Sequence, residues 1–334
     1  MLGNAPTYLI VGLVAGLVAA VFFGAVITGS AFSIGLVFLI PLPLFIAGLG
    51  WGVVSVLGGA VVGTIALVFM AGFKVGLAFA LQMAAAPVIL TYLSLISRPG
   101  PPGPNGQPAG VEWYPEGRLV LWTGAIVTGM IGIIVLAAGI DQEVLKRWGA
   151  EALEHITKLQ SEVSGQGGNA DGLDNFKTAF QSLVPHILSI TSMVWTVMTL
   201  AVFGLAARML NAAKRNIRTW APFCRLEFPR GATLALGAGV LASFLPGQFG
   251  LIGEAGMTTM ITAFSLLGLA SIHGILEHNS ARTPLLVLIY LVIFFFPLAL
   301  PGVMAMGLAE HLLGLRARFA SPPGGPTGPA SSNT

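Results

Sequence analysis

The side chains able to take part in proton transfer or ligand binding are few, and most of them stand within or beside long apolar runs. His273 and Glu277 are four residues apart, so they would share one face of a helix. Imidazole changes its charge near neutral pH, and beside a carboxylate it could form a proton or metal site. Because the sequence supplies no further ligands around this pair, we prefer to interpret it as a polar pair at the end of an apolar helix. We predict that the protein holds no metal and no cofactor.

Polar side chains also interrupt other apolar runs. Gln82 and Thr91 flank Pro87, and a proline within a helix leaves one backbone carbonyl without its hydrogen bond. The two side chains would either satisfy that carbonyl or line a cavity. A ligand site needs a few polar groups that converge in an apolar cavity, and this sequence offers few. The candidate ligand-binding residues are therefore Gln82, Thr91, Glu254, Ser271 and His273.

One stretch of the chain concentrates positive charge. Residues 208–230 contain six Lys or Arg residues against a single acid, with aromatic residues among them. Such a segment could rest on an anionic lipid leaflet, with a gain of about 1 kcal/mol per basic residue, or it could dock a cytoplasmic partner. The interpretation we prefer is that it only fixes the orientation of the chain in a membrane. The residues predicted to contact the inner leaflet or a partner are Lys214, Arg215, Arg218, Trp220 and Arg225.

Motifs of soluble enzymes are absent. The stretch from Gly172 to Thr178 matches a phosphate-binding loop only in part, because Phe176 stands where the second glycine is required. There is no H-E-x-x-H, no G-x-S-x-G and no pair of carboxylates within one apolar run. The lone Cys224 excludes an intrachain disulfide, and no basic face suited to nucleic acid is present. We predict a protein that is not an enzyme and does not bind nucleic acid.

Composition indicates that membrane helices position these residues. Hydrophobic residues make up 55% of the 334 residues and charged residues only 9%, whereas a soluble domain carries about 25% charged residues. A helix needs about 20 apolar residues to cross a bilayer. The predicted spans are residues 8–27, 34–49, 53–71, 75–96, 119–140, 184–210, 231–245, 257–276 and 284–300. The predicted fold is all-α, a polytopic transmembrane helix bundle of about nine spans, in a range of about eight to ten.

Lys and Arg residues predict the orientation of the bundle, because they accumulate in cytoplasmic loops. The basic stretch 208–230 should be cytoplasmic, and counting back along the spans makes loop 98–118 and the N-terminus cytoplasmic too. Residues 141–183 then lie outside, which suits their seven acids against four Lys or Arg residues. We expect a multi-pass protein of the bacterial cytoplasmic (inner) membrane whose first helix is retained. The side of the C-terminus stays open, since Pro301–Leu315 could turn back into the membrane.

Residues 1–318 are predicted to form a single transmembrane domain, followed by a disordered tail at 319–334. Its parts are the four-span N-terminal region 8–97, the Pro/Gly-rich cytoplasmic loop 98–118, the external loop 141–183 and the C-terminal spans 184–318. Within the cytoplasmic loop, Pro99–Pro104 should be disordered like the tail. In the external loop apolar residues recur at steps of three and four, which predicts an amphipathic helix. This stripe comprises Leu145, Trp148, Ala152, Ile156, Leu159 and Val163.

The first span carries small residues at regular intervals. Gly12, Gly16, Ala20 and Gly24 are each four residues apart, a spacing that lets the backbones of two membrane helices approach closely. The alternative is that glycine is merely frequent in this chain. We predict that these four residues form a helix-packing stripe.

Four short segments carry a resemblance to a known family. They are Ile40–Leu44 with Gly48–Gly52, Ser182–Pro185, Trp220–Pro229 and Gly268–His273, with an Arg-bearing helix after them. On these segments, which lie within residues 8–318, the chain resembles the DUF2232, or YybS-like, family of bacterial multi-pass membrane proteins. It departs from the family's pattern near its end, where Glu310-His311 stands in place of an aspartate ahead of the last arginines.

The family is similar in its N-terminal spans to the substrate-binding S-components of energy-coupling-factor transporters, and more distantly to the cell-shape membrane protein MreD. The first similarity implies a protein that binds a vitamin or metabolite between its helices. The external helix would then serve as a lid, and a separate cytoplasmic ATPase module would drive uptake. The second similarity implies a scaffold that binds no ligand and organises envelope-assembly or cell-shape proteins. The lipid bilayer is a partner in both cases. An ion or lipid transporter that acts alone is disfavoured, because paired buried charges are lacking.

Overall fold

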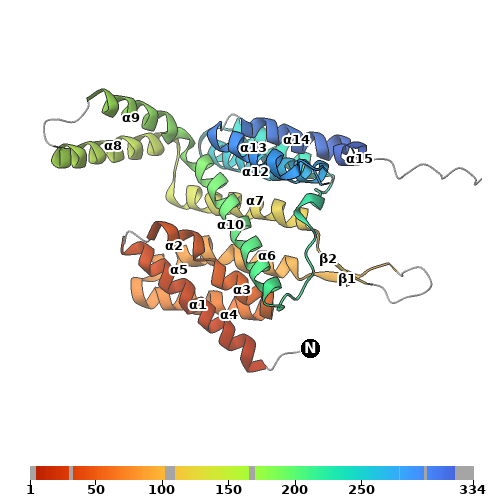
Figure 1. Cartoon of the computed structure of the whole chain (residues 1–334). Coiled ribbons are helices and arrows are strands. Elements are labelled where there is room, and N and C mark those ends of the chain that lie inside the picture. Colours follow the sequence, from red (N-terminus) through yellow and green to blue (C-terminus); the bar gives the residue numbers. More distant parts are fainter. Residues whose placement is uncertain are drawn as a thin grey trace, which may run out of the picture. The chain divides into compact units, whose positions relative to one another are not determined.

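The protein is helical along almost its whole described length (Figure 1). The computed structural model describes residues 5–29, 33–101, 110–164, 170–277, 279–296 and 299–319. The chain divides into two compact units, which we name unit 1 (Met1–Trp220 and Leu234–Thr262) and unit 2 (Ala221–Thr233 and Ala263–Thr334). The prediction of an all-α fold is confirmed. That residues 1–318 insert as a single transmembrane domain stays a prediction.

Six helical segments of the described chain are long and apolar enough to cross a bilayer. They are Thr7–Ile27 of α1 (Ala5–Ile27); α4 (Val53–Ala71); Phe73–Ser94, which joins α5 (Phe73–Phe79), the π-helical turn η1 (Ala80–Ala84) and α6 (Ala85–Ser94); α7 (Glu116–Ala138); Asn175–Ala212, which contains α10 (Ile187–Ala212); and α12 (Gly247–Ile275). Each overlaps one predicted span. Helices suit a bilayer because they satisfy their own backbone N–H and C=O groups.

The other three predicted spans form shorter apolar helices. They are α2 (Ser33–Leu39) with α3 (Leu42–Trp51), then α11 (Ala232–Ser243), then α13 (Arg282–Phe295). The segment that could turn back into the membrane forms a further apolar helix, α14 (Leu300–Leu313), before the short α15 (Leu315–Phe319). Helices α13 and α14 have 14 residues each, which makes them about 21 Å long. Neither can cross a hydrocarbon core of about 30 Å by itself.

Small residues let α1 and α4 of unit 1 approach closely. A methyl group on Gly12 would collide with the carbonyl group of Ser55, and one on Gly16 with that of Gly59. The Ser55 hydroxyl, 2.9 Å from the carbonyl oxygen of Tyr8, adds a hydrogen bond between the same two helices. These contacts explain why this part of α1 carries glycine.

The two remaining residues of the predicted packing stripe differ from each other. Ala20 is almost fully buried in the core of unit 1. Gly24 has open space around the position of a Cβ atom, so nothing at this position requires glycine. The close approach of α1 to α4 therefore involves the first half of the stripe.

Helix α10 connects the apolar clusters of unit 1. Its Trp195 side chain packs against three of them. Further along α10, the Phe203 ring lies edge-on to the ring of Phe45 on α3 and to that of Trp220, with 5.3 Å between ring centroids in both cases. The position of α10 in unit 1 is thus fixed by large side chains along its length.

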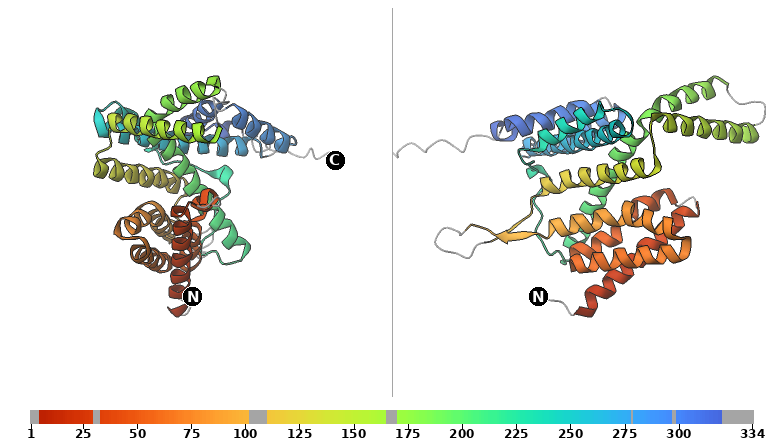
Figure 2. Two further views of the ribbon diagram at one scale, coloured as in Figure 1. Left: turned by 90° about the vertical axis from the view of Figure 1, so that its left-hand side faces the viewer. Right: turned by 180° about the vertical axis from the view of Figure 1, so that it is seen from behind.

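Two hairpins extend from opposite ends of unit 1 (Figure 2). At one end, α8 (Gln142–Ser164) covers the amphipathic helix predicted for the external loop, and together with α9 (Ala170–Leu183) it forms a helical hairpin. At the other end, β1 (Ser97–Pro99) and β2 (Val111–Trp113) pair antiparallel, with Ser97 opposite Trp113. We refer to these as the α8–α9 end and the β1–β2 end of unit 1.

The β1–β2 hairpin corrects the expectation that the Pro/Gly-rich stretch is disordered from its start. Pro99 belongs to β1, and the Gly100 N–H donates to the Gly110 carbonyl at 2.6 Å. Backbone pairing with β2 orders this part of the loop, although the sequence around it is rich in residues that disfavour strands. Residues 102–109 of the loop, and the predicted tail from residue 320 onward, lie outside the described residues.

In unit 2, α12 and α14 cross at two glycines. A methyl group on Gly268 would collide with the carbonyl group of Val303, and one on Gly307 with that of Phe264. Phe264 is fully buried, and its ring lies 5.4 Å from the Phe228 ring between centroids. The same small-residue principle that joins α1 to α4 therefore joins the last helices of the chain.

Candidate functional site

The α8–α9 end of unit 1 holds an ion pair between helices distant in sequence. His186 ends the short 3₁₀ helix η3 (Val184–His186), which leads into α10, and Glu254 lies two turns into α12. The His186 Nδ1 atom is 2.9 Å from the Glu254 Oε1 atom. The side chain of His186 is 62% exposed and that of Glu254 only 22%. The pair therefore marks the border between the water-exposed end of unit 1 and its interior.

One turn after His186, Ser189 presents a buried hydroxyl group. The residue is 8% exposed, and its Oγ atom has no hydrogen-bond partner among the described residues. Buried hydroxyl groups in proteins nearly always have a partner, and leaving one without costs about 1–3 kcal/mol. The described residues therefore leave the hydrogen-bonding capacity of the Ser189 hydroxyl unused.

Neighbouring hydroxyl groups on the same helices are satisfied, which sets Ser189 apart. Ser192 donates to the carbonyl of Ser189, and Thr196 to that of Ser192, at 2.7 Å each. Between α7 and α12, the Oγ1 atoms of Thr128 and Thr259 lie 3.1 Å apart. The hydroxyl groups of these residues therefore form their hydrogen bonds within the helix bundle.

Helix α8 packs onto the turn that bears His186. A Cβ atom on Gly149 would lie 2.6 Å from the Cγ2 atom of Val184, so the backbone of α8 passes very close to η3. Leu145 at the base of α8 is buried in a cluster that also contains Leu251 of α12. The Asp141 carboxylate accepts from the Val144 N–H at 2.8 Å near the start of α8. The base of the α8–α9 hairpin is thus anchored beside the ion pair.

The β1–β2 end of unit 1 is organised around a buried arginine. Arg218 is 3% exposed, and its guanidinium donates to the carbonyl oxygens of Ser94 at 2.9 Å and Tyr114 at 3.1 Å, and to the Glu116 carboxylate. Its Cζ atom lies 4.1 Å from the ring centroid of Trp220. Burial lowers the pKa of Arg218, and Glu116 opposes that shift; the side chain stays charged, as arginine does in proteins. We name this set of contacts the Arg218 clamp.

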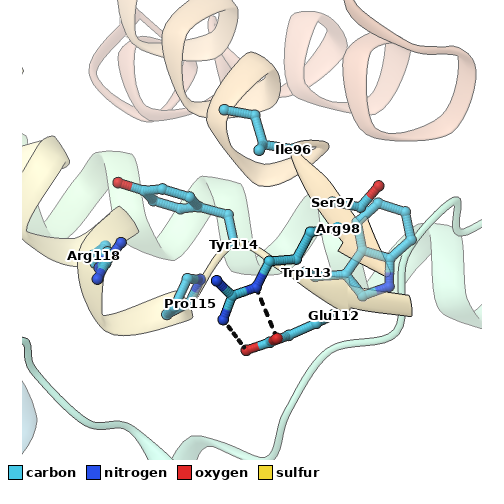
Figure 3. A pocket seen from close by; sticks show the side chains of 8 residues that line it. All are labelled: Ile96, Ser97, Arg98, Glu112, Trp113, Tyr114, Pro115 and Arg118. Atoms are coloured by element: carbon cyan, nitrogen blue, oxygen red, sulfur yellow. Dashed lines mark hydrogen bonds and ion pairs between the residues drawn. The ribbon is translucent and has the colours of Figure 1, made fainter. Parts of the chain in front are cut away.

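A small cleft of about 170 Å³ lies beside the Arg218 clamp (Figure 3). Its lining residues are Ile96, Ser97, Arg98, Glu112, Trp113, Tyr114, Pro115 and Arg118. Across the two strands, Arg98 donates to the Glu112 carboxylate from Nε at 2.9 Å and from Nη2 at 3.1 Å. This bidentate pair lowers the pKa of Glu112 and raises that of Arg98, chiefly through the hydrogen bond. Pockets for metabolites are usually about 300–1,000 Å³, so the cleft is too small to enclose one.

The basic stretch 208–230 is only partly the exposed surface that its sequence predicts. Lys214, Arg215 and Arg225 are exposed, and the Arg215 Cζ atom lies 5.6 Å from the ring centroid of Trp51. Arg218 differs from the prediction because Glu116 and the backbone carbonyls of Ser94 and Tyr114 compensate its buried charge. Trp220 is half-buried against it. The side chains of Arg218 and Trp220 hold the loop in place, and the exposed basic residues are Lys214, Arg215 and Arg225.

The structure gives the five candidate ligand-binding residues different surroundings. Glu254 belongs to the ion pair with His186. Thr91 is fully buried on α6, and its Oγ1 atom has no hydrogen-bond partner among the described residues. A methyl group on Gly48 of α3 would collide with the Thr91 side chain, so close helix packing occupies the space a ligand would need. Gln82 lies half-buried in the π-helical turn η1.

Ser271 and His273 belong to unit 2, where each has a partner. The Ser271 hydroxyl donates to the Leu267 carbonyl at 2.8 Å. The His273 Nε2 atom lies 3.0 Å from the Tyr290 hydroxyl. Glu277, predicted to pair with His273, has an Oε2 atom 4.0 Å from the sulfur of Cys224. The structure thus gives these two residues separate partners.

A second arginine clamp lies within unit 2. Arg316 of α15 donates to the Glu310 carboxylate and to the Leu226 carbonyl at 2.8 Å each, and to the Cys224 carbonyl. Glu310 is nearly buried. It is the acid that stands where the resemblance led us to expect an aspartate, and it gives Arg316 a carboxylate partner.

Sequence reasoning did not find His186 or Ser189. A histidine beside Pro185 at the start of a span is a recognisable signal of a polar helix end, but its partner Glu254 lies 68 residues away. Ser189 looks like any hydroxyl in a membrane helix. Only the absence of its usual hydrogen bond to its own helix distinguishes it.

Six helical segments of the described chain are long and apolar enough to cross a bilayer, which is the architecture of a multi-pass α-helical membrane protein. The sequence matches the family described as "Predicted membrane protein (DUF2232)" over residues 17–310, and the chain belongs to this family. The predicted family membership is confirmed. No curated protein and no solved structure shows significant similarity to the chain.

Proposed function

We propose that this protein is a membrane-embedded binding component, not an enzyme, that takes up a small polar solute together with a separate energising module. The observation that carries the proposal is the Ser189 hydroxyl, which is buried one turn along α10 from the His186–Glu254 pair and has no hydrogen-bond partner among the described residues. A solute at the α8–α9 end of unit 1 would supply the hydrogen bond that the protein leaves open. The proposed site contains Glu254, which the sequence analysis named as a candidate, and His186 and Ser189, which it did not name.

The three groups define the chemistry of the solute. A carboxylate accepts hydrogen bonds, whereas an imidazole and a hydroxyl both donate and accept. The solute should therefore carry both donors and acceptors, as a vitamin or metabolite with hydroxyl or amino groups does. Helix α8 is anchored on the turn that bears His186, which suits the α8–α9 hairpin to act as a lid over the bound solute.

The proposal includes an orientation. The α8–α9 end would face the outside of a bacterial cytoplasmic membrane, and the β1–β2 end and the N-terminus would face the cytoplasm. The distribution of charge supports this assignment, because residues 208–230 hold six Lys or Arg residues against one acid. An energising module would dock at the cytoplasmic end, where Arg118 and Arg215 are exposed.

Native mass spectrometry of the protein, purified in detergent from its own membrane, tests the proposal. We expect a small molecule bound to the wild type and lost from the variants His186→Ala and Ser189→Ala. Thr191→Val is the matched control, because its hydroxyl is exposed and donates to the Ile187 carbonyl of its own helix. A wild-type protein that carries no small molecule would count against a solute-binding role.

A scaffold role is the second candidate, and the Arg218 clamp favours it. The clamp fixes the segments around Ser94, Tyr114 and Glu116 against the basic loop, which gives the β1–β2 end a pre-ordered surface with exposed arginines. Charge reversal by Arg118→Glu or Arg215→Glu should then release envelope-assembly or cell-shape proteins that co-purify with the wild type. Lys158→Glu, on α8 at the other end of unit 1, is the control. Co-purification unchanged by all three variants would exclude this role for the surface.

A further inference from the structure

Helices α12 and α14 run in the same direction within unit 2. They cross where Gly268 and Gly307 meet. Further along, a Cβ atom on Gly274 would lie 2.9 Å from the Cδ atom of Arg316 in α15. Because Gly274 follows Gly268 and Arg316 follows Gly307, both helices proceed from the crossing towards the same end. The Cys224 carbonyl, which accepts a hydrogen bond from Arg316, marks that end.

Helix α13 begins shortly after α12 ends and must run in the opposite direction to reach the start of α14 (Figures 1 and 2). It lies beside the end of α12, since its Tyr290 hydroxyl is 3.0 Å from the Nε2 atom of His273. Its far end turns sharply into α14, where the Ala299 N–H donates to the Phe296 carbonyl at 2.8 Å. The two helices thus form a hairpin, which we name the α13–α14 hairpin. Its base is the end near Cys224, and its tip is the turn.

The charged residues of the α13–α14 hairpin lie at its base. The sequence has no charged residue between Arg282 at the start of α13 and Glu310 near the end of α14. At the base, the Glu310 carboxylate accepts from Arg316. Each helix has 14 residues, so the hairpin extends about 21 Å from base to tip, less than the hydrocarbon core of about 30 Å. An element of this length can enter the core from one side without reaching the other.

The tip carries the most exposed aromatic side chains of the hairpin. The side chains of Phe294–Phe296 are between 66% and 77% exposed, and contact with lipid would remove their apolar surface from water. A turn within hydrocarbon is costly when its N–H groups lack acceptors. This tip reduces the cost, because Pro297 and Pro301 have no N–H group. The Phe296 N–H donates to the Val292 carbonyl at 2.8 Å.

We propose that the α13–α14 hairpin is re-entrant. It enters the bilayer from the side that carries the basic stretch, places its phenylalanine tip among the acyl chains and returns to the same side. Arg316 then lies on the same side as Arg225 and Arg230, as the accumulation of Lys and Arg on one side predicts. The hairpin replaces the crossing predicted for residues 284–300 and puts the end of α15 beside the basic stretch. The proposal is independent of solute binding, because all the contacts that carry it lie within unit 2.

Labelling of single cysteines with a membrane-impermeant maleimide, in spheroplasts and in inverted vesicles, tests this path. In a Cys224→Ser background, cysteine is placed at exposed positions before α13 (Ser280→Cys), at the tip (Phe295→Cys) and in α15 (Ala317→Cys). Arg225→Cys is the control that reports the side of the basic stretch. We expect Ser280→Cys and Ala317→Cys to react from the same side as this control, and Phe295→Cys to react from neither side. All four should react after denaturation in SDS.

Each alternative path gives a different labelling pattern. A single kinked span would expose Ser280→Cys and Ala317→Cys on opposite sides of the membrane. Two complete crossings would expose Phe295→Cys on the side opposite the control. A hairpin that lies in water would expose Phe295→Cys on the same side as the control. Any of these three results would overturn the proposal.

A second measurement determines the depth of the tip. Bimane attached to Phe295→Cys should lose most of its fluorescence in vesicles of phosphatidylcholine brominated midway along the acyl chains, because bromine quenches on contact. Leu313→Cys is the matched control, since Leu313 is 52% exposed at the base end of α14, and bimane there should lose less. Equal quenching at the two positions would show that the tip does not reach the acyl chains and would overturn the proposal.

Discussion

Arg218 is the most fully enclosed charged side chain in the described part of the chain. Removing a charge from water is costly, and the cost is recovered only when every donor finds a good acceptor. Here a carboxylate, two backbone carbonyls and a tryptophan ring surround the guanidinium. Only arginine has a planar guanidinium group whose N–H groups can donate hydrogen bonds in several directions at once. The residue type is therefore dictated by the geometry of its partners.

Replacing Arg218 by alanine should destabilise the protein strongly. The change removes the hydrogen bonds that the guanidinium donates to the Glu116 carboxylate and to the carbonyls of Ser94 and Tyr114, and breaking a buried pair in this way costs about 3–5 kcal/mol. Arg218→Lys should recover only part of the loss, because an ammonium lacks the fork. Thermal unfolding in detergent measures the effect, with Arg215→Ala as the control at an exposed position. Equal melting temperatures for Arg218→Ala and Arg215→Ala would contradict the structural role of the clamp.

The partners of individual polar residues could not be predicted from the sequence. The basic stretch containing Arg218 could be recognised from its composition, but its partner Glu116 lies 102 residues earlier in the chain. The same holds for His186 and Glu254, which are 68 residues apart. Pairings of this length depend on how helices pack, and no local pattern encodes them. Glu254 could be singled out as a polar group in an apolar segment, whereas the reason for its burial could not.

The contact between α1 and α4 allows a comparison of two glycines on one helix. Gly16→Ala should destabilise the protein by about 1–3 kcal/mol, the usual cost of forcing extra atoms into a packed contact, because its methyl group would meet the Gly59 carbonyl. Gly24→Ala should be neutral or stabilising by up to about 1 kcal/mol, since open space surrounds that position. Melting temperatures of the two variants in the same detergent check this. A loss at Gly24 as large as that at Gly16 would show that the stripe packs along its whole length.

The β1–β2 hairpin should respond to acid. Arg98 lowers the pKa of Glu112 from its usual value of 4.5, so the folded hairpin binds a proton less readily than the unfolded one. The stabilisation by this pair is therefore complete above that value and is lost as the pH falls through the lower pKa of the paired carboxyl. Hydrogen exchange at the Gly100 amide, corrected for its intrinsic pH dependence, should accelerate in acid. Glu112→Gln removes the titrating group and should abolish the response; a response that persists would assign it to another residue.

At the level of elements, hydropathy predicted most helices, because a span of about 20 apolar residues is a local property. Helix α7 begins at Glu116, close to the start of the predicted span 119–140. The helical segment Phe73–Ser94 ends close to the end of the predicted span 75–96. Two features escaped prediction. The π-helical turn η1 leaves the apolar run unbroken, and the β1–β2 hairpin forms in a stretch whose proline and glycine content predicted disorder. Both depend on backbone geometry that side-chain hydropathy does not report.

At the scale of the whole molecule, the two ends of unit 1 differ in charge. Residues 141–183, which form the α8–α9 end, contain seven acids against four Lys or Arg residues, whereas the basic stretch 208–230 begins at the opposite end. Positive residues near the ends of spans resist transfer across the membrane, and acids contribute little to this effect. We therefore propose that the α8–α9 end lies outside and the β1–β2 end in the cytoplasm.

Reporter fusions measure this orientation directly. Alkaline phosphatase, which folds only outside the cytoplasm, should be active when fused after Ser164 at the end of α8 and silent when fused after Arg215. A green fluorescent protein fused at the same two positions should give the opposite pattern. Activity of both kinds at one position would indicate dual insertion, which the one-sided basic stretch disfavours. A full reversal would place the α8–α9 hairpin and the His186–Glu254 pair in the cytoplasm, where the site could receive a solute only for export.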